Sequence, residues 1–265
     1  MVVGKNVINP MLKVFRLLPN DFTFKTKVNK LNVAMTTSIA KIADATKKDG
    51  CQVIHLAYSG GVVSNILLRK FAVLGHNVIC HTIGGFGVAD PDIIFAKRGL
   101  LKFNGDNVLR HEAYMADLNS EKSKKECSLL LNSRTCIAHP YYDFLHEIVT
   151  KNAVSHLVIG EFANQLFAGS TYHSESNEGT YENIIRNTVL NCINEIDVIA
   201  SYYGVKIWLP MISPSIISEV RQFKLDELIR NKCGKLPLKA IAKFLEIPFE
   251  NENKDFNIIS LMPED

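Results

Sequence analysis

The sequence predicts an α/β fold in which helices cover both faces of a parallel sheet. Two observations lead to this prediction. Short apolar stretches rich in β-branched residues alternate with longer helical stretches through the middle of the chain. The first apolar stretch also runs directly into a Ser-Gly-Gly turn at 59–61, from which a helical pattern starts. The chain has 265 residues, 47% of them hydrophobic, which is ample for a large core.

The predicted elements follow one another in a regular order. The segment 51–59 is a buried strand that ends at the glycine pair, and further strands are expected at 77–85, 107–115 and 155–161. Between them lie helices at 62–75, 91–105 and 141–153, the first closed by Gly75 and the second started by Pro91 and closed by Gly105. Strands separated by helices of this length favour parallel pairing.

The first fifty residues carry an uneven charge, with nine Lys or Arg against three Asp or Glu. We expect this segment, 1–50, to be mostly helical, with a polar linker at 19–30 and a helix over 31–48. A basic segment of this kind is either an arm for an acidic partner or the solvated face of a helix. The second interpretation is favoured.

After about residue 175 helical patterns dominate, at 181–204, 213–223, 224–232 and 236–247. One short apolar stretch, 205–210, interrupts them. The predicted organisation is therefore an N-terminal basic segment (1–50), an α/β core (51–175) and a helical C-terminal part (176–265).

Composition excludes several classes of protein. The net charge of +3 is too small to indicate nucleic-acid binding. No run of about 18 apolar residues exists, and the N-terminus lacks the pattern of a signal peptide, so we expect a cytoplasmic protein without membrane contact. The six cysteines are scattered without a CxxC pair, which favours buried thiols. The histidines show no metal spacing, and His55 and His81 are expected to be core residues. The aromatic set at 139–145 is expected to pack within its helix.

The Ser-Gly-Gly turn is the first candidate site. A turn between a parallel strand and a helix places backbone N–H groups at the helix N-terminus, where they favour phosphate or pyrophosphate. Gly60 and Gly61 would let the backbone approach a ligand, and Ser59 and Ser64 would add hydroxyl donors. The alternative is a tight turn that binds nothing.

Four stretches in order then resemble one family. "SGGVVS" resembles the SGGxDS pyrophosphate loop of the N-type ATP pyrophosphatases (the PP-loop superfamily), and "GEFANQLFAGSTY" is similar to the GEGADELFGGY segment of asparagine synthetase and β-lactam synthetase. The segments 81–112 and 209–245 are similar to the family's PD and HHE region and to its KxxLRxA helix. The resemblance covers about 50–246 and implies the adenine nucleotide alpha-hydrolase-like fold of these ATP pyrophosphatases.

The resemblance also implies roles for individual residues. Glu161 matches the glutamate that assists the amine, and Lys235 matches the catalytic lysine. The residues implied for the nucleotide are Ser59, Gly60, Gly61, Ser64, Ile83, Gly84, Gly160 and Lys239, of which Lys239 takes the place of an arginine. Family members join an acyl-adenylate to an amine and release AMP and pyrophosphate. The segment before residue 50 is too short for a glutaminase domain, so such an enzyme would take another amine.

Three departures from the family pattern remove acids from one expected site. Val63 stands where the loop aspartate would hold Mg²⁺, and Asn164 and Gln165 replace a further aspartate and glutamate. Without these carboxylates a hard cation loses its protein ligands, so no metal-binding residue is predicted. ATP or AMP remains the expected ligand.

Three functions are open on these residues. The favoured one is a catalytically silent or repurposed relative that binds an adenine nucleotide, with a protein partner as a further possibility. The second is an ATP-dependent ligase that forms amides from a small-molecule carboxylate and an amine. The weakest is binding or modification of nucleic acid, which only the basic segment 1–50 supports.

Overall fold

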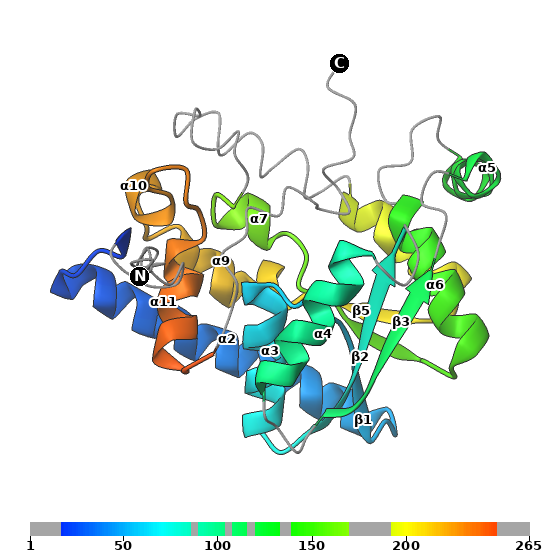
Figure 1. Ribbon diagram of the computed structural model, residues 1–265, viewed down its shortest axis with the longest axis horizontal. Coiled ribbons are helices and arrows are strands. Elements are labelled where there is room, and N and C mark those ends of the chain that lie inside the picture. The colour runs from blue at the N-terminus through cyan, green and yellow to red at the C-terminus, as the bar shows by residue number, and fades with distance from the viewer. Residues whose placement is uncertain are drawn as a thin grey trace, which may run out of the picture.

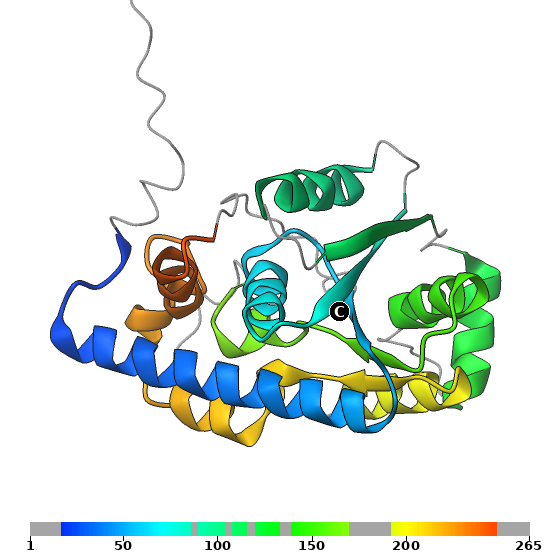
Figure 2. The ribbon, with the colours of Figure 1, turned by 90° about the horizontal axis from the view of Figure 1, so that it is seen from below.

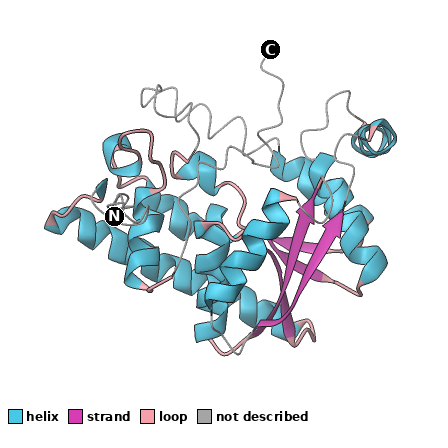
Figure 3. Cartoon of the chain, in the orientation of Figure 1, coloured by secondary structure: helices cyan, strands magenta, loops and turns pink. Residues whose placement is uncertain are grey.

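A five-stranded parallel sheet forms the centre of the molecule, with helices around it (Figures 1 and 3). The computed structural model describes residues 17–85, 90–103, 108–115, 120–132, 139–169 and 192–247. Helices lie on both faces of the sheet (Figure 2): α3 (Val62–Val73) and α4 (Pro91–Phe103) cover one, and α6 (His139–Lys151) packs on the other. The predicted fold class, α/β with a parallel sheet, is confirmed.

The strands follow the order β3-β2-β1-β4-β5. Their bounds are Val53–Ala57 for β1, Asn77–Gly84 for β2, Val108–Met115 for β3, His156–Val158 for β4 and Lys206–Trp208 for β5. The first three strands extend the sheet in one direction, and β4 and β5 extend it in the other. The order therefore reverses between β1 and β4, which are hydrogen-bonded neighbours. Such a switch point is where ligands bind in open α/β sheets.

The fifth strand lies in the part of the chain that was predicted to be helical. It forms in the apolar stretch 205–210, where Lys206, Ile207 and Trp208 pair in parallel with β4. Three residues are too few to show a strand periodicity, so only the pairing with β4 defines this strand. The helix α5 (Glu121–Leu131), which packs against α6, was also not predicted.

The polar linker predicted at 19–30 is wrong, because these residues form the first turns of the long helix α2 (Phe22–Lys48). Asp21 caps this helix by accepting a hydrogen bond from the Phe24 backbone N–H at 2.8 Å. Phe24 is buried and packs edge-on against Phe223. A tertiary contact therefore overrides the polar composition of the segment.

Helix α2 lies along the molecule and is docked to it (Figure 2). Its apolar stripe, which includes Leu31, Met35 and Ile39, belongs to the main core. The buried Lys70 of α3 donates to the side chains of Asn32 at 2.7 Å and Thr36 at 2.6 Å. These contacts favour the solvated-face interpretation for the described part of the basic segment. The same core continues to Ile247 and so includes residues from all three predicted segments.

The C-terminal part is mostly helical, as predicted. Residues 192–202 form a helix, while the rest of the predicted 181–204 helix lies outside the described residues. The other elements are α7 (Ala163–Leu166), the 3₁₀ helix η2 (Pro210–Ile212), α9 (Pro214–Val220), α10 (Leu225–Leu228) and α11 (Leu236–Phe244). The predicted 224–232 helix is reduced to the four residues of α10.

Two expectations from composition can be compared with the described residues. None of the helices in the described ranges is long and apolar enough to cross a membrane. Cys80, Cys192 and Cys233 are buried free thiols, as expected. Cys127 is different, because this buried residue of α5 forms a disulfide, so the expectation of free thiols is wrong there.

Candidate functional site

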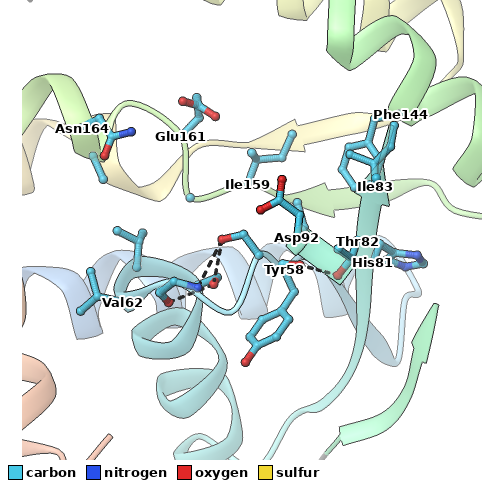
Figure 4. Close-up of a pocket in the computed structure, with 18 of the residues that line it drawn as sticks. Tyr58, Val62, His81, Thr82, Ile83, Asp92, Phe144, Ile159, Glu161 and Asn164 are labelled. Carbon is cyan, nitrogen blue, oxygen red and sulfur yellow. Dashed lines mark hydrogen bonds between the residues drawn. The ribbon is translucent and has the colours of Figure 1, made fainter. Parts of the chain in front are cut away.

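A pocket opens at the carboxyl ends of β1, β2 and β4, where the strand order reverses (Figure 4). Its volume is about 200 Å³. Three connections build most of its walls: residues 57–64 after β1, residues 81–85 at the end of β2, and residues 159–164 after β4. Asp92, Phe144 and Lys235 complete the lining. Parallel strands end at the same edge of the sheet, so segments far apart in sequence meet here.

The floor of the pocket is the Ser-Gly-Gly turn and the first turn of α3. Gly61 is the N-cap of α3, and no side chain caps this end among the described residues. The Ser59 hydroxyl accepts from the Gly61 N–H at 3.4 Å, and the Ser64 hydroxyl donates to the Gly61 carbonyl at 3.1 Å. The backbone N–H groups of the first helical turn therefore have no partner within the helix and can bind an anion.

Gly60 differs from the other predicted loop residues, because it does not line the pocket. Its φ of +73° is a conformation that favours glycine, and a Cβ there would lie 2.8 Å from the Phe95 carbonyl oxygen of α4. The turn is held by Asn65, which donates to the Gly60 carbonyl at 2.8 Å and accepts from the Tyr58 hydroxyl. Gly60 is thus required by the close approach of α4, and its predicted contact with a ligand stays a prediction.

The end of β2 forms a second wall. Ile83 and Gly84, predicted to lie beside the adenine, both line the pocket. The Asp90 carboxylate accepts from the Gly85 N–H at 2.9 Å and from the Asp92 N–H at 2.7 Å, which ties the strand end to the start of α4. This arrangement places the Asp92 side chain in the pocket wall.

The segment after β4 supplies Gly160 and Glu161, as predicted. Glu161 accepts hydrogen bonds from the Tyr141 hydroxyl of α6 and from the Phe162 N–H. Phe162 has a φ of +66°, so the chain turns sharply directly after the glutamate. Burial raises the pKa of Glu161, although these hydrogen bonds and the charge of Lys235 lower it in part. The side chain is therefore a fixed carboxyl group with a weakened acidity.

Lys235 reaches the pocket from the start of α11. Its backbone N–H donates to the Phe167 carbonyl at 2.9 Å, which joins α11 to the segment after β4. Burial and the nearby Lys239 ammonium lower the pKa of Lys235 to about 8, while Glu161 acts in the opposite direction. Lys239 is buried, donates to the Cys233 sulfur at 3.0 Å and does not line the pocket, and its predicted contact with a nucleotide stays a prediction.

The three neutral replacements lie in different surroundings. Val63 and Asn164 line the pocket, whereas Gln165 is buried and does not. Within the described ranges no three His, Cys, Asp or Glu side chains are grouped so that they could hold a metal ion. The donor set at the positions expected to hold Mg²⁺ therefore does not fit this hard cation, which prefers carboxylates and water.

Residues that the sequence did not single out also line the pocket: Tyr58, His81, Thr82, Asp92, Phe144, Ile159 and Ala163. Asp92 has a sequence signal only for the start of a helix, because acids are favoured in the first helical turn. Tyr141 and Phe144 lack one, since their helix was predicted only to pack. Tyr141 in fact binds Glu161, so this aromatic set takes part in the site.

His81 is a core residue and also lies in the pocket floor. Its Nε2 lies 2.8 Å from the Nδ1 of His55, and its Nδ1 lies 2.7 Å from the Tyr114 hydroxyl. Tyr114 in turn donates to Glu112 at 2.5 Å. Both ring nitrogens of His81 are therefore satisfied within the protein, as expected of a core histidine. Burial, with a contribution from His55, lowers the pKa of His81 to about 3.

Comparison with known proteins finds no family model that matches this chain and no curated protein that matches it.

Proposed function

We propose that this protein binds an adenine nucleotide or its pyrophosphate moiety in the pocket between β1 and β4, as a silent or repurposed relative of the N-type ATP pyrophosphatases. The observation that carries the proposal is the meeting of separate sequence segments at one switch point. Ser59, Gly61 and Ser64 lie opposite Gly160 and Glu161, and Lys235 joins them from α11. These are the segments for which the sequence resembles that family.

The size and chemistry of the pocket support a phosphate-bearing ligand. Its volume of about 200 Å³ is below the roughly 300–1,000 Å³ typical of pockets that enclose a drug-sized ligand. The described walls therefore suit one part of a nucleotide. The N-terminus of α3 is attractive to the phosphate end, and the apolar Ile83 and Phe144 are suited to a base.

Calorimetric titration of the full chain with ATP, AMP and inorganic pyrophosphate tests this proposal. We expect at least one of the three to bind, and binding to weaken at least tenfold in the variant Ser64→Tyr, which fills the space over the loop. Ser215→Tyr on α9, outside the pocket, serves as the matched control. If none of the three ligands binds, with or without Mg²⁺, the proposal is wrong.

A second candidate function is an ATP-dependent ligase that forms an amide through an acyl-adenylate. It is favoured by one observation, that Glu161 and Lys235 both line the same pocket. A carboxyl group of raised pKa could take a proton from an amine, and an ammonium could stabilise the charge that develops on the phosphate. Release of pyrophosphate from ATP by the wild-type chain, in the presence of carboxylic acids and amines, would establish this activity. Its loss in Lys235→Met would assign it to the pocket.

A further inference from the structure

The positions expected to carry acids no longer present negative charge beside the phosphate loop. Val63 is 8% exposed, and its Cγ1 lies 2.8 Å from the point that a Cβ on Gly160 would occupy. The valine thus packs against Gly160 and fills the space between α3 and the segment after β4. Gln165 is 2% exposed and lies outside the pocket lining. A cation beside this loop would find no carboxylate at either position.

Asn164 and Lys235 occupy the space that remains, around Gly169. A Cβ on Gly169 would lie 2.4 Å from the Lys235 Cε and 2.7 Å from the Asn164 Oδ1, so the two side chains flank one point. The Oδ1 of Asn164 is buried and has no hydrogen-bond partner among the described residues, although Asn164 itself is 9% exposed and lines the pocket. A buried amide oxygen without a donor is costly, and it points to an amide that changes orientation or gains a partner when the pocket is filled.

The Lys235 side chain is also without a hydrogen bond or ion pair in the described part of the chain. An ammonium held in a pocket wall without a partner attracts an anion. The Asn164 amide can turn so that its NH₂ group donates to the same anion, since its oxygen and nitrogen ends have the same shape. Together they offer a positive charge and two kinds of N–H donor opposite the N-terminus of α3.

Two carboxylates remain in the pocket and must be considered. Glu161 is engaged by the Tyr141 hydroxyl, which donates to its Oε2, and by the Phe162 N–H. Asp92 projects from the first turn of α4, which is a separate wall from Asn164 (Figure 4). Neither carboxylate stands at the position of the three replaced acids.

We propose that the Lys235 ammonium and the Asn164 amide take the place of a metal ion, so that this pocket binds the metal-free form of a pyrophosphate-bearing anion. This inference rests on the proposed function, because it names the form of the ligand that the same pocket takes. It also predicts the direction in which Mg²⁺ changes the affinity for pyrophosphate. Magnesium ions that chelate free pyrophosphate lower the concentration of the bound form, so added Mg²⁺ weakens the apparent affinity.

Calorimetric titration of the full chain with inorganic pyrophosphate tests the inference, once with a chelator and once with excess Mg²⁺. We expect binding in the chelator, at least fivefold weaker apparent affinity with Mg²⁺, and at least a tenfold loss in Lys235→Met. The exposed Lys232→Met makes the same change in net charge three residues away and should stay within twofold of the wild type. Asn164→Asp should weaken metal-free binding and make Mg²⁺ favourable.

The outcomes separate the two proposals. Pyrophosphate binding that requires Mg²⁺ overturns the inference and leaves the proposed function in place, and loss of that binding in Asp92→Asn would then identify Asp92 as the metal ligand. If ATP or AMP binds and pyrophosphate does not, the inference is also overturned and the proposed function stays in place. If no ligand binds under either condition, both proposals are wrong. The magnesium comparison uses the wild-type chain, so it stands even if a variant does not fold.

Discussion

At the scale of single residues, the chemistry of the pocket depends on the burial of a few ionisable side chains. Glu161 and Lys235 lie in the same pocket without forming an ion pair, and burial weakens the ionised form of both. Groups whose pKa values are shifted in this way are typical of sites, because an incoming ligand can supply the missing interaction. The pocket therefore contains two ionisable groups whose charged forms are disfavoured by burial. Val63 and Asn164 are neutral and offer no charge that would bind a metal.

The pKa of Lys235 predicts how binding changes with pH. Its folded value of about 8 is below the ordinary 10.5, so the ammonium is present below pH 8 and is lost as the pH rises above it. Pyrophosphate affinity of the wild type should fall by up to about tenfold per pH unit above pH 8, until the higher pKa of the liganded lysine is reached. Calorimetry from pH 7 to pH 9.5 measures this.

Lys235→Arg is the matched variant, because an arginine stays protonated throughout this range. The ratio of the two affinities removes the titration of pyrophosphate itself. A ratio that is constant from pH 7 to pH 9.5 would contradict the prediction that Lys235 loses its proton in this range.

At the scale of elements, the strands β1, β2 and β3 share a buried polar chain. His55 bonds to His81, His81 to Tyr114, and Tyr114 to Glu112, which also pairs with Arg110 at 2.5 Å. These side chains come from three neighbouring strands, and Asn152, the residue that follows α6, donates to Glu112. Buried networks of this kind are stable only while each member keeps its partner and its protonation state.

Acid should therefore destabilise the fold through His81. The unfolded histidine takes up a proton near pH 6.5 whereas the folded one resists until about pH 3, so stability falls as the pH drops through this window. Between pH 7 and pH 5.5 this residue alone should account for about 1 kcal/mol of the free energy of unfolding. Urea unfolding at the two pH values measures it. In His81→Gln the difference between the two values should shrink by that amount, and an unchanged difference would contradict the account.

Helix α2 has a basic composition, which suggests a solvated helix, but it contributes side chains to the main core. It is basic in charge, yet Leu31 is completely buried and Val33, two residues on, is 58% exposed. Leu31→Ala should lower the free energy of unfolding by about 2–5 kcal/mol, because it leaves a cavity in the main core. Val33→Ala on the same helix should change it by less than about 0.5 kcal/mol. Equal, small effects in denaturant unfolding would mean that α2 is not part of the cooperative core.

At the scale of the whole molecule, the pocket lies where segments far apart in the chain meet. Its walls come from β1, β2, α3, α4, α6, the segment after β4 and the residue before α11, so a ligand there contacts residues from Ala57 to Lys235. Binding should consequently stabilise the molecule as one unit. At a ligand concentration of about 100 times Kd the gain is about 2.7 kcal/mol, which corresponds to a rise in Tm of roughly 5–10 °C for a chain of this size.

Thermal unfolding with and without pyrophosphate, ATP or AMP measures this rise. Leu31→Ala is a useful companion, since it should lower the starting Tm and leave the ligand-induced increase intact. A ligand that binds in calorimetry but leaves Tm unchanged would place its site outside the cooperative fold.

The sequence by itself determined four of the parallel strands and most of the loop residues at their ends. Strand and helix patterns at 51–161 gave four parallel strands in order, because buried strands and amphipathic helices have distinct periods. Ser59, Ser64, Gly160, Glu161 and Lys235 were identified from the stretches around them, and the structure brings them to one pocket. The turn between a strand and a helix was sufficient to identify Ser59 and Ser64, whereas Gly160, Glu161 and Lys235 were implied by the resemblance to the N-type ATP pyrophosphatases.

Only the tertiary structure decided the rest, since it depends on contacts between distant segments. The strand β5 exists through its pairing with β4, and the start of α2 is helical because Phe24 is buried against Phe223. Gly60 faces α4 and not the pocket, and Lys239 is drawn to Cys233, because the docking of α4 and α11 sets their direction. The same docking places the Lys235 ammonium and the Asn164 Oδ1 where neither has a hydrogen-bond partner among the described residues. A local sequence pattern does not predict the direction of these side chains, because it is set when the helices and the sheet pack together.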